Sequence, residues 1–211
     1  MEPVIELKGV VAVLGSFPAL AGIDLTVQRG EILLLQGPNG AGKTSLLRVC
    51  AGLLPIERGE GRVLGIDVTS QRELIRARVG LLGHSNGLYL DLSVEQNIMF
   101  WAATVGASDA EVASAMKRMN VDGRLAKVKA SQLSAGQRRR TALASLIVRR
   151  AEIWLLDEPH AGLDASGRDE LDGLLRDAVA AGATVVLASH ESERANGLAT
   201  RVVTVDGGGA R

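Results

Sequence analysis

A glycine-rich segment near the start of the chain carries the clearest chemistry. Residues 37–44 read Gly-Pro-Asn-Gly-Ala-Gly-Lys-Thr, which matches the phosphate-binding pattern G-x-x-x-x-G-K-[ST] at every defined position. Glycines allow backbone N–H groups to converge on phosphate oxygens, and the start of a following helix favours an anion. In this pattern Lys43 reaches the β- and γ-phosphates, and the Thr44 hydroxyl ligates Mg²⁺.

The flanking sequence favours a nucleotide site over a plain glycine-rich turn with a surface lysine. An apolar run over 31–36 precedes the segment, and an amphipathic run over 43–54 follows it. A strand, a loop and a helix in this order form the context that the phosphate-binding pattern requires. We therefore predict a nucleoside triphosphate bound by a phosphate loop that comprises Gly37, Pro38, Asn39, Gly40, Ala41, Gly42, Lys43, Thr44 and Ser45.

Two adjacent carboxylates follow another apolar run. Asp157 and Glu158 come directly after residues 153–156, which read Ile-Trp-Leu-Leu. In open α/β sheets, ligands bind outside the carboxyl ends of the strands, the edge that also carries the phosphate loop. Asp157 is suited to hold the Mg²⁺ shell, and Glu158 is suited to polarise an attacking water. Taken alone, the pair could equally be an exposed turn, but the phosphate loop favours the catalytic interpretation.

A histidine follows a third apolar run, residues 183–188. An imidazole there can sense the γ-phosphate and orient the water, so we predict a functional role for His190. The alternative is an ordinary surface or core histidine with its hydrogen bonds satisfied. We prefer that alternative for His160, which lies two residues after Glu158.

Composition limits the class of protein. With 211 residues, 46% of them apolar, the chain is long enough for one domain with a proper core, which excludes a disordered tail. Lys and Arg number 24, as do Asp and Glu, so no net charge holds the chain on DNA, RNA or anionic lipid. The single cysteine, Cys50, excludes a disulfide framework, indicates a reducing compartment and is expected in the core.

Apolar runs and turn residues predict an α/β fold with a parallel sheet. No apolar run reaches the roughly 18 residues of a membrane span, and the N-terminus lacks a secretory signal, so we expect a cytosolic chain. We expect two or three short strands in the first thirty residues, short strands and turns over 56–83, and a loose tail at 207–209. Buried strands are predicted at 31–36, 79–82, 153–156, 183–188 and 201–205, and helices at 43–54, 93 onward, 108–119, 136–148 and 168–181.

A short segment before the carboxylates points to a family. Leu133-Ser-Ala-Gly-Gln137 would by itself be only the start of a helix, but its serine stands 23 residues before Asp157. With the phosphate loop upstream, it resembles the signature sequence LSGGQ of ABC-type ATPases, with Ala135 in place of a glycine. Residues 161–164, Ala-Gly-Leu-Asp, are similar to the D-loop of this family, and His190 to its switch histidine. The resemblance extends over essentially the whole chain, with five motifs in the family's order.

The resemblance implies a fold and an assembly. The fold is a P-loop NTPase (RecA-like) core with a small antiparallel β subdomain and an inserted α-helical subdomain, within a single ABC ATPase domain over 1–211. Residues 1–84 and 146–211 would form the ATP-binding core, and 85–145 the helical subdomain. Two copies would pack head to tail, with each ATP between one phosphate loop and the partner's signature segment. That segment comprises Leu133, Ser134, Ala135, Gly136 and Gln137, and its free N–H groups make a second anion site.

Two departures from the family pattern affect the predicted site. His84 stands where the family has a glutamine that contacts Mg²⁺ and the membrane partner, so it is a further candidate metal contact. The aromatic residue that stacks on adenine is missing from its usual place, and Leu14 or Phe17 is the candidate replacement. The resemblance further implies separate integral-membrane subunits that receive the ATPase cycle near residues 84–97. The chain would then lie on the inner face of the cell membrane.

The first departure narrows the subfamily. Four short segments resemble the ATPase subunit of the haem exporter in cytochrome c biogenesis: Gly83-His84, Gly87-Leu88, residues 92–97 and Phe100-Trp101. Other small-molecule or drug exporters use the same motor and stay open as an alternative. An ABC ATPase acting on nucleic acid or the ribosome is disfavoured, because the chain has one ATPase module and zero net charge. A non-hydrolysing regulatory module would need an impaired site, and none of its expected residues is missing.

Two arginine clusters remain. Residues 138–140 and 149–150 are expected to form solvated helix faces, the second favourably placed at a helix C-terminus. The alternative is an interface with acidic residues or with nucleotide.

Overall fold

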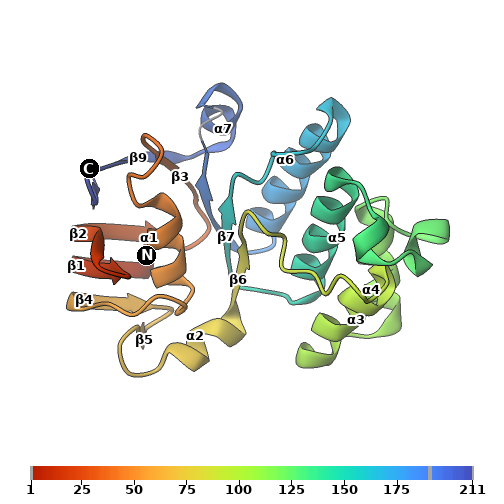
Figure 1. Cartoon of the computed structure of the whole chain (residues 1–211), viewed down its shortest axis with the longest axis horizontal. Coiled ribbons are helices and arrows are strands. Elements are labelled where there is room, and N and C mark those ends of the chain that lie inside the picture. Colours follow the sequence, from red (N-terminus) through yellow and green to blue (C-terminus); the bar gives the residue numbers. More distant parts are fainter. Residues whose placement is uncertain (1, 190–191, 211) are drawn as a thin grey trace. The chain divides into compact units, whose positions relative to one another are not determined.

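The computed structural model describes residues 2–189 and 192–210. Packing divides the chain into two units (Figure 1). Unit 1 comprises Met1–Leu81, Glu152–Glu158 and Leu175–Arg211, and unit 2 comprises Leu82–Ala151 and Pro159–Leu174. Among the described residues, no helix has both the length and the apolar character needed to span a bilayer.

Unit 1 contains a four-stranded antiparallel sheet in the order β2-β1-β4-β5. Its strands are β1 (Pro3–Leu14), β2 (Phe17–Gln28), β4 (Arg58–Val63) and β5 (Ile66–Asp67). Of the two or three short strands predicted in the first thirty residues, two are present, but they are not short: β1 and β2 form one hairpin of two twelve-residue strands. Register shifts such as the one between Leu7 and Val10 break the alternation of apolar residues without ending the strand.

The second sheet has six strands in the order β10-β9-β3-β8-β7-β6. These are β3 (Ile32–Gln36), β6 (Val79–Leu82), β7 (Ile153–Asp157), β8 (Thr184–Ala188), β9 (Arg201–Asp206) and β10 (Gly209–Ala210). Strands β9, β3, β8 and β7 run parallel, and β7 and β8 are buried along their whole length. Such strands read as continuous apolar runs, so the predicted α/β class with an antiparallel β subdomain is confirmed.

Helix α1 (Lys43–Cys50) packs against strands of both sheets and shares their core (Figure 1). It ends four residues before the predicted Leu54, because Gly52 adopts a left-handed conformation with φ +68°. Cys50 is 1% exposed, as predicted for a core residue. Burial raises the pKa of its thiol to about 12, so the residue acts as a small apolar side chain.

Three elements of unit 1 differ from the sequence-based expectation. Helix α2 (Arg72–Arg78) replaces expected turns, and only Ile75 of it is buried, which leaves no helical period to detect. Helix α7 (Ser192–Leu198) was not anticipated. The expected loose tail at 207–209 is instead the turn of a hairpin, in which Gly207 and Gly208 have φ values of +54° and +80° and join β9 to β10.

Unit 2 is helical, with α3 (Val94–Val105), α4 (Asp109–Arg118), α5 (Ala135–Val148) and the first part of α6 (Ala165–Ala180). Ser93, Ser108 and Ser134 each close a capping box at the start of a helix. Two 3₁₀ turns, Gly123–Lys127 and Ala130–Gln132, separate α4 from α5, in the interval between the helices predicted at 108–119 and 136–148.

Candidate functional site

The phosphate loop of unit 1 requires glycine at two positions for two reasons. Gly37 and Gly42 have φ values of +143° and +104°, in the region that favours glycine. A Cβ on Gly42 would lie 2.6 Å from the carbonyl oxygen of Ala19 in β2, and one on Gly37 would overlap the carbonyl oxygen of Val205 in β9. The loop backbone is therefore held between two strands, and α1 begins directly after it.

The lysine of the loop is largely buried, with 8% of its surface exposed. Its ammonium nitrogen donates hydrogen bonds to the carbonyl oxygens of Gly37 and Pro38, at 2.6 and 2.9 Å. These contacts fold the side chain of Lys43 back over the loop. They keep its positive charge at the loop that leads into α1, a helix start that favours an anion.

The hydroxyl of Thr44 and the carboxylate of Asp157 meet, although 113 residues separate them in the chain. Thr44 Oγ1 donates a hydrogen bond to Asp157 Oδ2 at 2.7 Å. Asp157 ends β7 and is 8% exposed, and Thr44 is in the first turn of α1. A hydroxyl and a carboxylate are hard oxygen ligands, which Mg²⁺ takes together with waters and substrate phosphates. Within the described residues no group of three or more His, Cys, Asp or Glu is placed to hold a metal.

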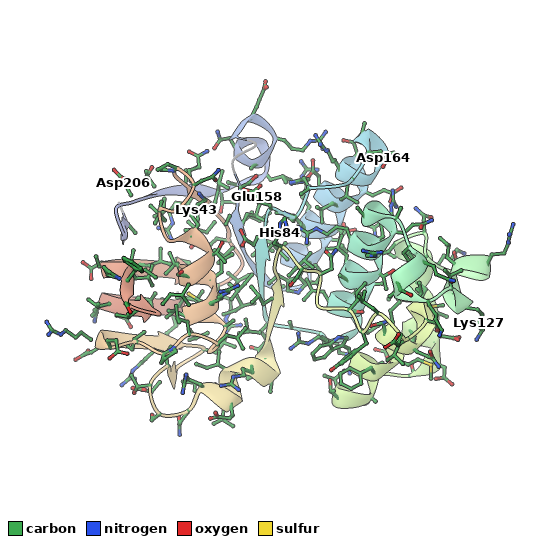
Figure 2. The ribbon with its side chains drawn as sticks, in the orientation of Figure 1. Lys43, His84, Lys127, Glu158, Asp164 and Asp206 are labelled. Carbon is green, nitrogen blue, oxygen red and sulfur yellow. The ribbon has the colours of Figure 1, made fainter. Side chains whose placement is uncertain are left out.

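Glu158 has a strained backbone, with φ +46° in a residue that is not glycine. Its N–H donates to the carbonyl oxygen of Ala188 at 2.8 Å, and Ser189 Oγ donates to Glu158 Oε2 at 3.2 Å. Both partners come from the end of β8, beside β7 in the sheet. They fix the glutamate at the edge of unit 1 that carries the phosphate loop, where Figure 2 labels Lys43 and Glu158. Ser189 was not singled out from the sequence, where it is marked only by its place before His190, which lies outside the described residues.

The signature segment lies in unit 2, at the start of α5. Leu133 is buried, whereas Ser134 and Ala135 are exposed. Ser134 Oγ accepts a hydrogen bond from the Gln137 N–H at 3.2 Å, and Gln137 Oε1 accepts one from the Ser134 N–H at 2.9 Å. A Cβ on Gly136 would lie 2.9 Å from the carbonyl oxygen of Gly162, so this glycine lets the D-loop approach the helix closely.

His84 also belongs to unit 2 and is exposed. It lies in a turn where Asn86 has φ +23° and accepts a hydrogen bond from Arg139 through Oδ1. Its role as a metal contact stays a prediction.

The first arginine cluster is not the solvated helix face that we expected, whereas the second lies at the C-terminus of α5, as predicted, with Arg150 exposed. Arg138 donates to the carbonyl oxygens of Ala130 and Ser131, and Arg140 pairs with Glu170 and, at 3.6 Å, with Asp164. Arg139 is 3% exposed and donates to three acceptors within unit 2. In the second cluster, Arg149 stacks over Trp101 at 4.3 Å from the ring centroid, and Arg150 pairs with Glu111. In the first cluster, the charges are used for hydrogen bonds and ion pairs inside the unit.

His160 is a buried structural histidine, as the sequence suggested. It is 2% exposed, and its Nε2 lies 2.7 Å from Asp172 Oδ1. Among the described residues, no hydrogen-bond partner lies at its Nδ1.

Both candidate adenine contacts lie at the end of the β1–β2 hairpin. Leu14 and Phe17 face each other across the turn and are 52% and 78% exposed. Phe17 stands two residues before Ala19, whose carbonyl oxygen lies against Gly42 of the phosphate loop. The exposed ring is therefore close in the chain to the strand that supports the loop.

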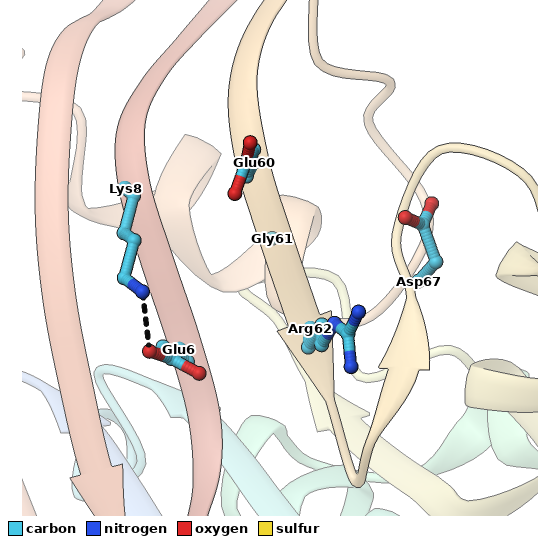
Figure 3. Close-up of a pocket in the computed structure, with 6 residues that line it drawn as sticks. All are labelled: Glu6, Lys8, Glu60, Gly61, Arg62 and Asp67. Atoms are coloured by element: carbon cyan, nitrogen blue, oxygen red, sulfur yellow. Dashed lines mark ion pairs between the residues drawn. The ribbon is translucent and has the colours of Figure 1, made fainter.

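A charged hollow of about 450 Å³ lies on the antiparallel sheet (Figure 3). An ion pair in this hollow joins Lys8 Nζ to Glu6 Oε1 at 2.9 Å. None of its residues belongs to the predicted site, and its lining carries charges of both signs, unlike a site for a polyphosphate. It is lined by Glu6, Lys8, Glu60, Gly61, Arg62 and Asp67.

Comparison with known proteins agrees with the fold and the motifs. A phosphate loop after a buried strand, whose threonine bonds a carboxylate at the end of another strand of the same sheet, is the arrangement of a P-loop ATPase. The family model described as ABC transporter matches residues 20–161. The chain therefore belongs to the ABC transporter family, as an ATP-binding subunit that hydrolyses ATP.

Several curated relatives carry the same name. The cytochrome c biogenesis ATP-binding export protein CcmA of Mesorhizobium japonicum is 38% identical over 83% of this chain and 86% of the relative. The protein of the same name from Bordetella bronchiseptica is 39% identical over 87% and 83%. The dimeric structure of MJ0796, a bacterial ABC transporter cassette, is 25% identical, covers 98% of this chain and 96% of its own, and has a TM-score of 0.87. The structure of an ATP-binding subunit of an ABC transporter has a TM-score of 0.90 at 23% identity, which supports the fold.

Proposed function

We propose that the phosphate loop, Asp157 and Glu158 form the hydrolytic site of this ATPase. The observation that carries the proposal is the 2.7 Å hydrogen bond from Thr44 to Asp157, which joins the start of α1 to the end of β7. When ATP binds, the loop N–H groups take its phosphate oxygens, and Lys43 exchanges its two loop carbonyls for the β- and γ-phosphates.

Thr44 and Asp157 would hold Mg²⁺, with His84 as a candidate contact through a metal-bound water. When bound, the ion neutralises charge on the β- and γ-phosphates. The hydroxyl of Thr44 has lone pairs that could ligate the ion while its proton stays in the hydrogen bond to Asp157.

Glu158 would act as the base that polarises the attacking water. Its hydrogen bond from Ser189 and its fixed backbone hold the carboxylate at the strand end, so it is positioned before the substrate arrives. We propose His190 as the residue that senses the γ-phosphate and helps to orient the same water.

We propose that hydrolysis requires two copies, each supplying its signature segment to the ATP on the other. Ser134 is exposed, and its hydroxyl accepts from Gln137 while its own proton stays available for a γ-phosphate oxygen. The start of α5 adds N–H groups that favour the same anion. The dimeric structure of MJ0796 supports this assembly. In each copy of this chain, residues 1–84 and 146–211 would form the ATP-binding core, and residues 85–145 would form the helical subdomain.

Exposed apolar side chains in unit 2 support a membrane-embedded partner. Tyr89, Leu90, Met99 and Phe100 are between 42% and 52% exposed. The ring of Phe100 lies edge-on to Tyr89 at 5.0 Å and to Trp101 at 5.3 Å. This aromatic patch is close in sequence to His84, where we expect the ATPase cycle to reach separate integral-membrane subunits. The chain would then be peripheral on the inner face of the membrane.

The names of the relatives support an export role in cytochrome c biogenesis, with haem as the proposed cargo. Another small-molecule exporter that uses the same motor is the second candidate. Purification of Glu158→Gln from membranes in ATP, followed by identification of the co-purifying polypeptides, tests the role. We expect integral-membrane subunits to co-purify with the variant. We also expect that deletion of this protein from the cell causes a loss of c-type cytochromes. Normal cytochrome levels on deletion would refute the haem role.

A further inference from the structure

Helix α5 carries a buried guanidinium that the proposed chemistry does not use. Arg139 lies two residues after the signature segment and is 3% exposed. Its Nε donates to the Pro159 carbonyl oxygen at 3.1 Å, and its Nη1 donates to the Gly83 carbonyl oxygen at 2.9 Å and to Asn86 Oδ1 at 3.0 Å. A fully buried charge is costly unless it is well hydrogen-bonded, so these bonds are needed for the side chain to stay there.

The two carbonyl partners occupy special places in the chain. Unit 2 begins at Leu82 and resumes at Pro159, so Gly83 and Pro159 lie where the backbone enters this unit on two separate occasions. Gly83 immediately precedes His84, and Pro159 immediately follows Glu158. One guanidinium therefore binds the main chain one residue away from two residues of the proposed site.

Arginine is suited to this arrangement. Its donors are fixed in one plane, so two acceptors bound to the same guanidinium are also fixed relative to each other. A lysine at this position keeps the charge but has a single nitrogen and cannot reproduce the fork. Hydrogen bonds from a charged donor are also stronger than neutral ones.

The loop after Pro159 is held along its length. His160 binds Asp172 at 2.7 Å, Asp164 lies 3.6 Å from Arg140, and Gly162 lies against Gly136. The loop therefore cannot easily absorb a shift of the Pro159 carbonyl, and a change at Arg139 is passed to the backbone on both sides of that residue.

We infer that Arg139 is a positioning residue for ATP hydrolysis. It holds the backbone at Gly83, just before His84, and at Pro159, just after Glu158, against the signature helix. The inference rests on the proposed function, since it assigns a support to the proposed site. A purely structural arginine would stabilise unit 2 without affecting turnover beyond the loss of folded protein.

The neighbouring Arg138 is a matched control. It is on the same helix and also donates to two backbone carbonyl oxygens, those of Ala130 and Ser131, at 3.0 Å each. Neither residue belongs to the proposed site. Arg139→Lys and Arg138→Lys therefore remove the same kind of contact from different segments.

The test measures ATPase kcat and KM, urea unfolding, and amide hydrogen exchange by mass spectrometry for the full chain and both variants. For Arg139→Lys we expect kcat to fall about tenfold or more, with KM changed less than about threefold, as for lost positioning in the transition state. Exchange should quicken in peptides covering 83–88 and 159–164. For Arg138→Lys we expect kcat within about twofold of the parent and faster exchange only around 130–131.

Equal kcat values in the two lysine variants would overturn the inference, as would unchanged exchange at 83–88 and 159–164 in Arg139→Lys. Arg139→Met removes the charge as well; if it does not fold, the lysine variant still decides the question. If Glu158→Gln hydrolyses ATP at the parental rate, the proposed function is overturned and this inference with it. If Glu158→Gln loses ATP hydrolysis but Arg139→Lys keeps the parental rate, only the inference about Arg139 is overturned.

Discussion

Replacing Glu158 by glutamine should separate catalysis from folding. Gln has the same shape and meets the same backbone strain at φ +46°. Its amide oxygen can still accept the hydrogen bond from Ser189, which is already long at 3.2 Å. The bond changes from charge-assisted to neutral, so the free energy of unfolding should change by about 1 kcal/mol or less.

The expected loss of turnover is much larger. A general base contributes about 10²- to 10⁴-fold to the rate, which corresponds to roughly 3–5 kcal/mol in the activation free energy. ATP binding should persist, because the phosphate loop and Asp157 are untouched. Without hydrolysis, the two copies should stay together in ATP.

Phosphate release, ATP binding and size-exclusion chromatography with and without Mg-ATP provide the assay. Glu60→Gln is the matched control, because it removes the same charge from an exposed position on the antiparallel sheet. A Glu158→Gln protein that hydrolyses ATP at the parental rate would refute the assignment of the base. A variant that loses turnover but stays monomeric in ATP would refute the proposed dimer.

Three further changes test the site and the packing. Lys43→Ala should abolish ATP binding or turnover, and unchanged values for both would remove its role in phosphate binding. Gly42→Ala should lower the free energy of unfolding by about 2 kcal/mol or more beyond the loss in Gly22→Ala. The two glycines have similar φ values (+104° and +97°), but only at Gly42 would the new Cβ lie 2.6 Å from a carbonyl oxygen. Equal losses in the two variants would contradict the steric argument. A hydrogen bond from the Ser108 N–H and the contact with Arg150 lower the pKa of Glu111 from 4.5 to about 2, so its stabilising contribution is present above pH 4.5 and lost as the pH falls toward 2. Urea unfolding should show the parent and Glu111→Gln converging from pH 6 to pH 3, and a constant difference would contradict it.

Much of the site was predictable because its motifs are local and the sheet rule is general. The phosphate loop is contiguous in sequence, and the parallel-sheet rule placed Asp157 at the same edge as Thr44 without knowledge of the strand order. Their 2.7 Å contact agrees with that reasoning. Ser189 could not be found in this way, because a serine after a strand has no distinctive pattern.

The arginines of α5 show what a sequence leaves open. Three consecutive charges predict a solvated face when only the helix is considered, since charged residues seldom lie buried. Whether hydrogen-bond acceptors are available to these arginines depends on distant segments of the chain. For Arg139 they are Gly83 and Pro159, which are 56 and 20 residues away in the sequence. Helix α2 was missed for a related reason, because a helix with one buried residue has no apolar stripe.

The same separation between local and distant effects makes two variants informative together. Glu158→Gln alters a reacting group but leaves the backbone at Pro159 and Gly83 tied to Arg139. Arg139→Lys leaves every reacting group in place but loosens that backbone. If chemistry and positioning are distinct, the first variant should lose turnover with unchanged hydrogen exchange over 83–88, and the second should lose part of its turnover with faster exchange there. Because the two changes act on the same step, the double variant should be no slower than Glu158→Gln alone, as non-additivity within one catalytic unit requires.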